Sequence, residues 1–230
     1  AVLGCCPVKV DHRLSQWSLA LFQLVLFAAL RYTDRHMKIT KAIRAFGLII
    51  LAMGLSGCAG SRLCQSYTPA EGDLIFQALP LDVDLVVAIE GVTESHYSHV
   101  GVLHRRNGTW TVIEATGAGV IYTPFDKWKT VGRDERWAAF RLKAEHREHL
   151  PQFIANLHPH AGKQYDFKYE LDENKLYCSE LVYHAWRQTT GQRMGKLTAL
   201  GDLNWKPHQA MIEKYNGGPM PPNRKMISPI

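Results

Sequence analysis

Hydrophobic and polar positions divide the chain into two long apolar runs, at residues 17–30 and 45–55, and a mixed region that begins near residue 70. In the mixed region, short apolar runs bounded by turn residues predict strands, and longer mixed stretches predict helices. Strands are expected at 74–76, 100–104, 109–115, 120–123 and 137–142. Helices are expected at 81–91, 145–157 and 179–188, the last ended by Gly191. Residues 162–172 are expected to form a loop, and the Pro-rich tail from Gly217 to be irregular.

A turn signal joins two of the predicted strands. Asn107-Gly108 lies between the β-rich runs 100–104 and 109–115, and Asn-Gly is a strong signal for a tight hairpin turn. Strands come first and helices surround them in the order of the chain. The sequence therefore predicts the α+β class, with a small antiparallel sheet or partial barrel packed with helices.

The second apolar run is typical of an export signal. It follows the first methionine of the chain, Met37, and a basic stretch with Lys38, Lys41 and Arg44. The run is too short for a comfortable membrane span, which needs roughly 20 apolar residues. It ends in Leu55-Ser56-Gly57-Cys58, which resembles the lipobox of bacterial lipoproteins. We therefore expect residues 37–57 to be a signal peptide and Cys58 to receive lipid; the alternative is a buried helix that happens to end in cysteine.

The flanking segments follow from this interpretation. Residues 1–36 are expected to be a non-native upstream extension, since a second export signal is unnecessary; a true N-terminal membrane helix is the alternative. Residues 58–70 are rich in Gly, Ser, Gln, Thr and Pro, which predicts a tether. Residues 71–230 are the expected catalytic domain. Because Ala59 follows Cys58, the resemblance to Gram-negative lipoproteins implies an anchor in the outer membrane, facing the periplasm.

The net charge of +6 does not indicate nucleic-acid binding. Residues 1–57 hold seven Lys and Arg against two Asp and Glu, whereas residues 58–230 hold twenty against nineteen. The basic excess lies in the segment expected to be removed, and the remaining part is nearly neutral. No broad basic face, and hence no nucleic-acid partner, is predicted.

Cys178 is the candidate nucleophile. It immediately precedes the predicted helix 179–188, and a thiol at a helix N-terminus is stabilised as thiolate by the partial positive charge there. Free N–H groups at the same place can hold an oxyanion. Taken alone, the residue could equally be a small buried apolar cysteine.

A cysteine nucleophile needs a base, and His99 is the best-placed candidate. It lies at the start of a predicted strand, and Glu114 lies in the strand that pairs with it across the Asn107-Gly108 turn. Both would then lie near the same end of the hairpin, where a carboxylate can orient an imidazole. Considered separately, His99 could be an ordinary hydrogen-bonded histidine and Glu114 an exposed strand charge. The pair His146 and His149 lacks an H-E-x-x-H frame, so a solvated helix face is favoured over a metal site.

Five segments in a fixed order resemble the YaeF/YiiX group of permuted NlpC-type, papain-like enzymes. They are GDLIFQ at 72–77, SHVG at 98–101, VIEA at 112–115, GKQYDF at 162–167 and YCSELV at 177–182, and KMISP at 225–229 is similar to the C-terminal segment of that group. The resemblance covers about residues 70–230. It implies a permuted papain-like fold in which the histidine strand precedes the cysteine helix, with Cys178, His99 and Glu114 as a catalytic triad and no cofactor or metal.

The chemistry that this resemblance implies is amide hydrolysis or acyl transfer through a thioester. The expected substrates are peptides, N-acyl amino acids or lipids of the cell envelope. Trp110, Trp128 and Trp137 could line an apolar groove for such a substrate, or could simply pack in the core. Three alternatives stay open: an acyltransferase or lipid esterase of the same fold, a catalytically silent binding lipoprotein, and a metal hydrolase that uses histidines.

Overall fold

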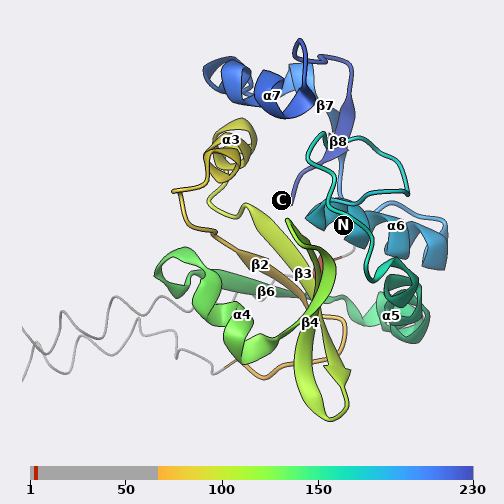
Figure 1. Cartoon of the computed structure of the whole chain (residues 1–230). Coiled ribbons are helices and arrows are strands. Elements are labelled where there is room, and N and C mark those ends of the chain that lie inside the picture. The colour runs from red at the N-terminus through yellow and green to blue at the C-terminus, as the bar shows by residue number, and fades with distance from the viewer. Residues whose placement is uncertain (1–2, 5–66, 230) are drawn as a thin grey trace, which may run out of the picture. The chain divides into compact units, whose positions relative to one another are not determined.

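The computed structural model describes residues 3–4 and 67–229, so the predicted signal peptide and Cys58 lie outside the described residues. At the centre is an antiparallel sheet with the strand order β1-β6-β2-β3-β4-β5 (Figure 1). Its strands are β1 (Leu3–Gly4), β2 (Leu74–Gln77), β3 (His99–Arg106), β4 (Thr109–Thr116), β5 (Gly119–Pro124) and β6 (Trp137–Leu142). The five strands predicted from the sequence are all present, and the α+β class is confirmed.

The β3–β4 hairpin turns at Asn107-Gly108, as predicted. Both residues have positive φ, 49° and 80°, which is the requirement of a type I′ turn and explains the Asn-Gly pair. The register places Arg106 opposite Thr109 and Val102 opposite Ile113. This register also determines which side chains of the two strands share a face.

Side chains of alternating residues cover both faces of the sheet. One face carries Val100, Val102 and Ile113 and packs against α5 (Leu150–Leu157) and α6 (Cys178–Thr190). The opposite face carries Leu103, Val112 and Glu114, and α4 (Phe125–Val131) packs on strands β4 and β5. In Figure 1, α5 and α6 lie side by side on one side of the sheet, and α4 lies on the other.

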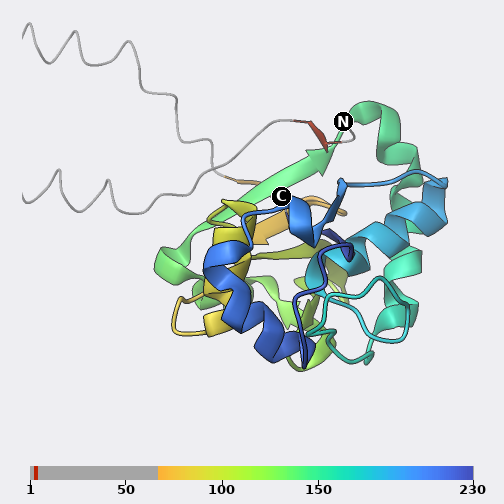
Figure 2. The ribbon, with the colours of Figure 1, turned by 90° about the horizontal axis from the view of Figure 1, so that it is seen from above.

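A second group of elements lies beside the sheet. Helices α3 (Asp84–Thr93) and α7 (Gln209–Asn216) are in contact, and both views show them together (Figures 1 and 2). A two-stranded sheet pairs β7 (Leu197–Ala199) with β8 (Lys225–Ile227). The expectation of an irregular tail from Gly217 was therefore wrong for residues 225–227, because a three-residue strand is too short to show a periodic pattern.

The predicted helix 145–157 is divided in two. Residues Ala144–His149 form a 3-10 helix, and the α-helix begins only at Leu150, directly before Pro151. Proline lacks an N–H and is tolerated in the first turn of a helix but not in its interior, so the α-helix starts here. The remaining 3-10 segments are Arg133–Glu135, His158–His160, Leu200–Asp202 and Lys206–His208. No helix among the described residues is long and apolar enough to cross a membrane.

Candidate active site

Cys178 is the first residue of α6 and is a free thiol with only 2% of its surface exposed. Tyr177, just before it, has an extended backbone and ends the loop that leads into the helix. A side-chain hydrogen bond joins the thiol to His99, the first residue of β3. The N-terminus of a helix and the start of a central strand thus bring a buried thiol and a buried imidazole together.

Glu114 lies on the other side of the His99 ring. The Nε2 atom of His99 is 2.6 Å from Oε2 of Glu114, and both side chains are almost fully buried. Since Nε2 faces the carboxylate, Nδ1 is the ring nitrogen left for the thiol. This ring orientation lets one histidine exchange a proton with Cys178 while Glu114 holds it in place.

Two more side chains orient the carboxylate of Glu114. The indole Nε1–H of Trp128 donates to Oε2 at 2.9 Å, and the hydroxyl of Thr123 donates to Oε1 at 2.5 Å. The sequence indicated Trp128 only as a groove or core residue, since helix α4 was not predicted, and Thr123 only as part of a strand. Three donors from three elements therefore converge on one buried acceptor.

Gly101 provides the room for this arrangement. A Cβ atom at position 101 would lie 2.4 Å from a methyl carbon of Val112 and 3.2 Å from Cβ of Glu114. The residue is two positions after His99 on the same strand, so it lies on the same face of the sheet. The glycine in the segment 98–101 thus has a steric reason in the packing of Glu114.

Charge interactions favour an ionised pair at this site. Burial alone would raise the pKa of the Cys178 thiol, but the hydrogen bond and charge of His99 outweigh it, with help from the N–H groups of Val100 and Ser179, and hold it below its usual value. Burial alone would lower the pKa of His99, but its bonds to Cys178 and Glu114 raise it to about 10. The pKa of Glu114 is lowered despite burial, chiefly by His99. Between the two pKa values the stable form is a thiolate beside an imidazolium.

The C-terminal segment is hydrogen-bonded to both sequence neighbours of Cys178. The N–H of Ile227 donates to the hydroxyl of Tyr177 at 3.0 Å, and the hydroxyl of Ser179 donates to the carbonyl of Ile227 at 2.8 Å. These bonds link β8 to the first turn of α6. A segment about 50 positions later in the chain thereby helps to hold the thiol in place.

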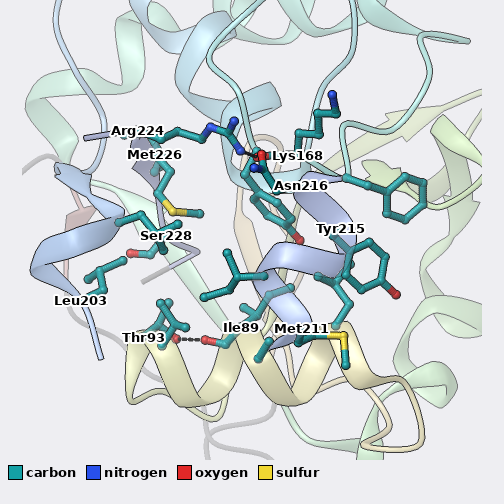
Figure 3. A pocket seen from close by; sticks show the side chains of 18 of the residues that line it. Ile89, Thr93, Lys168, Leu203, Met211, Tyr215, Asn216, Arg224, Met226 and Ser228 are labelled. Atoms are coloured by element: carbon teal, nitrogen blue, oxygen red, sulfur yellow. Dashed lines mark hydrogen bonds between the residues drawn. The ribbon is translucent and has the colours of Figure 1, made fainter. Parts of the chain in front are cut away.

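An apolar groove lies between α3, α7 and the C-terminal segment (Figure 3). Its apolar lining includes Leu85, Ile89, Val92, Met211, Ile212 and Met226. Tyr169 and Ile227 also line the groove, and Ile227 is hydrogen-bonded to both sequence neighbours of Cys178. The ring of Tyr169 lies 4.7 Å from that of Tyr177, centroid to centroid. The groove is therefore apolar, and it is connected to the surroundings of Cys178 through Ile227 and through the contact between Tyr169 and Tyr177.

Comparison with known proteins identifies the family. Residues 68–225 match the family described as "Permuted papain-like amidase enzyme, YaeF/YiiX, C92 family". The chain belongs to this family. It is 31% identical over 170 residues to the uncharacterized protein YiiX of Escherichia coli strain K12, a match that covers 71% of this chain and 81% of that protein. Its structure is similar to that of "metalloprotein yiiX" from Escherichia coli O157:H7, with a TM-score of 0.64, 30% identity, and 71% of this chain and 91% of that one covered.

Membership of the C92 family confirms the predicted permuted papain-like fold and thiol peptidase/amidase class. As expected for a permuted member, the histidine strand β3 precedes the cysteine helix α6 in the chain. The residues that carry the family resemblance in the sequence, Cys178, His99 and Glu114, are also those that the structure brings together. The protein is thus a cysteine hydrolase of the amidase type.

The other tryptophans and histidines considered in the sequence do not line the groove, and of these only Trp128 contacts Glu114. Trp128 and Trp137 are buried and Trp110 lies near Arg105, and none of the three lines the groove. His146 and His149 instead contact the ring of Trp186. Among residues 67–229, no group of three or more His, Cys, Asp or Glu side chains is arranged to hold a metal ion. These residues therefore provide no set of ligands for a metal such as the description "metalloprotein" of the Escherichia coli structure implies. No catalytic step is assigned to a metal.

Proposed function

We propose that this family member hydrolyses an amide bond through a thioester acyl-enzyme, with Cys178 as nucleophile, His99 as acid and base, and Glu114 as the residue that orients His99. The observation that supports this most strongly is the position of the His99 ring, hydrogen-bonded to the thiol on one side and to a buried carboxylate on the other. The lowered pKa of Cys178 supports the same roles, since the thiolate is the attacking species.

The reaction has two halves. The Cys178 thiolate attacks the substrate carbonyl carbon, and the oxygen takes up negative charge that N–H groups at the start of α6 can stabilise. The His99 imidazolium then gives its proton to the amide nitrogen, the C–N bond breaks, and a thioester remains. A water molecule then attacks the thioester while His99, now neutral, takes up its proton. The bond to sulfur breaks, the carboxylic acid product leaves, and Cys178 and His99 return to the thiolate and imidazolium forms.

Alkylation and turnover of variants test these roles together. Full-length protein is treated with iodoacetamide at a series of pH values, the Cys178 peptide is quantified by mass spectrometry, and hydrolysis of N-acyl amino acid p-nitroanilides is followed. Cys178→Ala and His99→Ala should each abolish turnover, and His99→Ala should move the alkylation midpoint towards the free thiol value of roughly 8.5. Equal alkylation profiles for wild type and His99→Ala would contradict the proposal and leave a silent binding protein as the better description.

The apolar groove favours a substrate whose acyl part is apolar. An acyltransferase or a lipid esterase is therefore the second candidate function. Met211 lines the groove, and Leu81 is an exposed leucine that does not. Met211→Glu should reduce kcat/KM for octanoyl amides relative to acetyl amides, whereas Leu81→Glu introduces the same charge outside the groove and should not. If both variants treat the two chain lengths alike, the groove does not hold the acyl group. Supplying an amine or alcohol acceptor and measuring acyl product separates transfer from hydrolysis.

We further propose that the protein acts at the cell envelope as a lipoprotein that starts at Met37 and is anchored through lipidated Cys58, in the outer membrane facing the periplasm. The support is the sequence pattern alone: a basic start, an apolar run and a lipobox-like end at Cys58. Several acyl chains would anchor it stably, since a single chain binds only marginally. Mass spectrometry of the native protein should find a lipidated N-terminal Cys58. Peptides from residues 1–36 in the mature protein would contradict the processing scheme, and inner-membrane fractionation would contradict the location.

A metal hydrolase is the remaining alternative. Turnover that survives dialysis against a chelator and disappears in Cys178→Ala would favour the thiol mechanism. Turnover that is lost on chelation and restored by a divalent metal would favour the alternative.

A further inference from the structure

A second carboxylate is buried directly behind the nucleophile. Glu180 lies two residues after Cys178 in the first turn of α6, and none of its surface is exposed. Its Oε2 accepts the backbone N–H of Tyr177 at 3.3 Å, and its Oε1 lies 3.1 Å from Nε2 of His184, one turn further along the helix. Glu180 thus ties the residue that precedes the thiol to a histidine of the same helix.

His184 connects this buried carboxylate to the surface. Its second ring nitrogen, Nδ1, lies 3.6 Å from Oε1 of Glu173, a carboxylate that is 72% exposed. The other titratable or charged groups that act on Glu180 and His184 come from the loop before α6 and from the 3-10 segment 158–160. They are Asp166 and the Tyr177 phenol beside Glu180, and His160 beside His184, with Lys163 acting on His160. Polar groups therefore extend from the solvent-exposed Glu173 through His184 to Glu180 in the first turn of α6.

We propose that Glu180 is a positioning residue for the reaction: together with the partly buried His184, it sets the orientation and reactivity of Cys178 through the backbone of Tyr177. The inference rests on the proposed function, because it concerns the same nucleophile. Glu180 does not touch substrate or the reacting atoms and acts only through the first turn of α6.

The pair can keep its hydrogen bond in either protonation state. With Glu180 ionised, His184 donates from Nε2 and Oε2 accepts the N–H of Tyr177 as a charged acceptor. With Glu180 protonated, its hydroxyl can donate to Nε2 while the His184 proton sits on Nδ1, facing Glu173. Burial raises the pKa of Glu180 to about 7, against the lowering by His184, so the change of state falls near neutral pH.

Ionisation of Glu180 should change the reactivity of the thiolate. The carboxylate adds a negative charge next to Cys178 and makes the thiolate more basic, and a more basic thiolate is the stronger nucleophile. The carboxylate also holds the N–H of Tyr177 more strongly than a neutral acid, since charge-assisted hydrogen bonds are the stronger ones. Both effects predict a faster Cys178 reaction above pH 7 than below it.

The test is the pH dependence of Cys178 alkylation in the full chain, which needs no substrate. Wild type should show, besides the thiol ionisation, a rise of roughly two- to fivefold in the rate of reaction with iodoacetamide, with a midpoint near pH 7. Glu180→Gln keeps an oxygen acceptor for Tyr177 but cannot titrate, so this step should disappear. His184→Gln keeps a donor to Glu180 but removes the imidazole, whose interactions lower the pKa of Glu180, so the step should move to higher pH.

Glu148→Gln is the matched control. Glu148 also lies beside a histidine, with 3.8 Å between its Oε1 and Nε2 of His149, but its side chain is 77% exposed, and its substitution should leave the step where it is. A step that persists in Glu180→Gln, or that does not move in His184→Gln, overturns the proposal. If Glu180→Gln does not fold, the His184→Gln profile decides the question. A failure of the proposed function would be a separate result, because it would appear as turnover by Cys178→Ala and not as a change in this pH step.

Discussion

Glu114→Gln distinguishes orientation of His99 from any direct part of Glu114 in the reaction. Trp128 can only donate a hydrogen bond, and its Nε1–H faces the same oxygen, Oε2, that faces His99. In the glutamine variant, the amide oxygen must therefore turn towards Trp128 and, with it, towards His99. The NH₂ group is left facing Thr123, whose hydroxyl can rotate from donor to acceptor. The variant keeps the hydrogen-bond pattern and loses only the charge.

The size of the effect follows from that loss. A hydrogen bond to a charged partner contributes roughly 1.5–3 kcal/mol and a neutral one roughly 0.5–1.5 kcal/mol. The difference for the His99 bond is then about 1–1.5 kcal/mol, which corresponds to about a tenfold fall in kcat/KM. The pKa of His99 should also fall, because Glu114 raises it, so the alkaline limit of activity moves to lower pH. The assay is kcat/KM against pH on N-acyl amino acid p-nitroanilides.

The double variant Glu114→Gln/Trp128→Phe tests whether Trp128 is what turns the amide oxygen of the glutamine towards His99. Without the indole N–H, the amide of Gln is free to present its NH₂ group to Nε2 of His99. That contact stabilises the tautomer with its proton on Nδ1, which cannot accept a proton from the thiol. The double variant should therefore lose far more activity than the two single losses multiplied, while Trp128→Phe alone is mild. A purely multiplicative result, or a Glu114→Gln loss as large as that of His99→Ala, would refute this account.

Three further predictions follow from single contacts. Gly101→Ala should lower stability by about 1–3 kcal/mol and reduce turnover, because its Cβ meets Val112 and Glu114; unchanged melting would contradict the packing argument. Tyr177→Phe should cost about 1–3 kcal/mol in chemical unfolding by leaving the Ile227 N–H without its acceptor, and an unchanged midpoint would mean that water replaces the hydroxyl. The raised pKa of Glu180 stabilises the fold at low pH, and this contribution is lost as pH rises from about 4.5 to about 7. The free energy of unfolding of Glu180→Gln should therefore rise relative to that of wild type by about 3 kcal/mol over that range. Parallel curves of this free energy against pH for the two proteins would contradict the prediction.

The hairpin was predictable because its determinants are local. Short β-rich apolar runs mark β3 and β4, and Asn107-Gly108 determines the turn and hence the register. With the register known, the closeness of His99 and Glu114 follows from the sequence. The same reasoning could have found Gly101, since a glycine inside a strand signals a close approach by a neighbour.

The partners of Glu114 were not predictable in this way. Trp128 lies on a seven-residue helix, α4, whose pattern is too short to recognise, and Thr123 is an ordinary strand residue. Both bind Glu114 because of packing between elements distant in sequence. Glu180 is a similar case: an acidic residue in the first turn of a helix looks like a normal cap, and only tertiary burial makes it unusual.

The geometry of the site explains why the chemistry can tolerate a permuted chain. His99 and Glu114 come from one hairpin, so their contact depends only on a local register. Cys178 comes from a different element, and its thiol is held by contacts that do not depend on chain order: the N–H of Val100 at the start of β3 and the Ile227 backbone on either side of the helix start. Each of these contacts joins the end of one element to the end of another. The site therefore requires that the starts of β3 and α6 meet, but it does not depend on the order in which the chain connects them. Substitutions that remove the long-range contacts of Tyr177 and Ser179 with Ile227 should therefore loosen the hold on the thiol while leaving the His99–Glu114 contact in place.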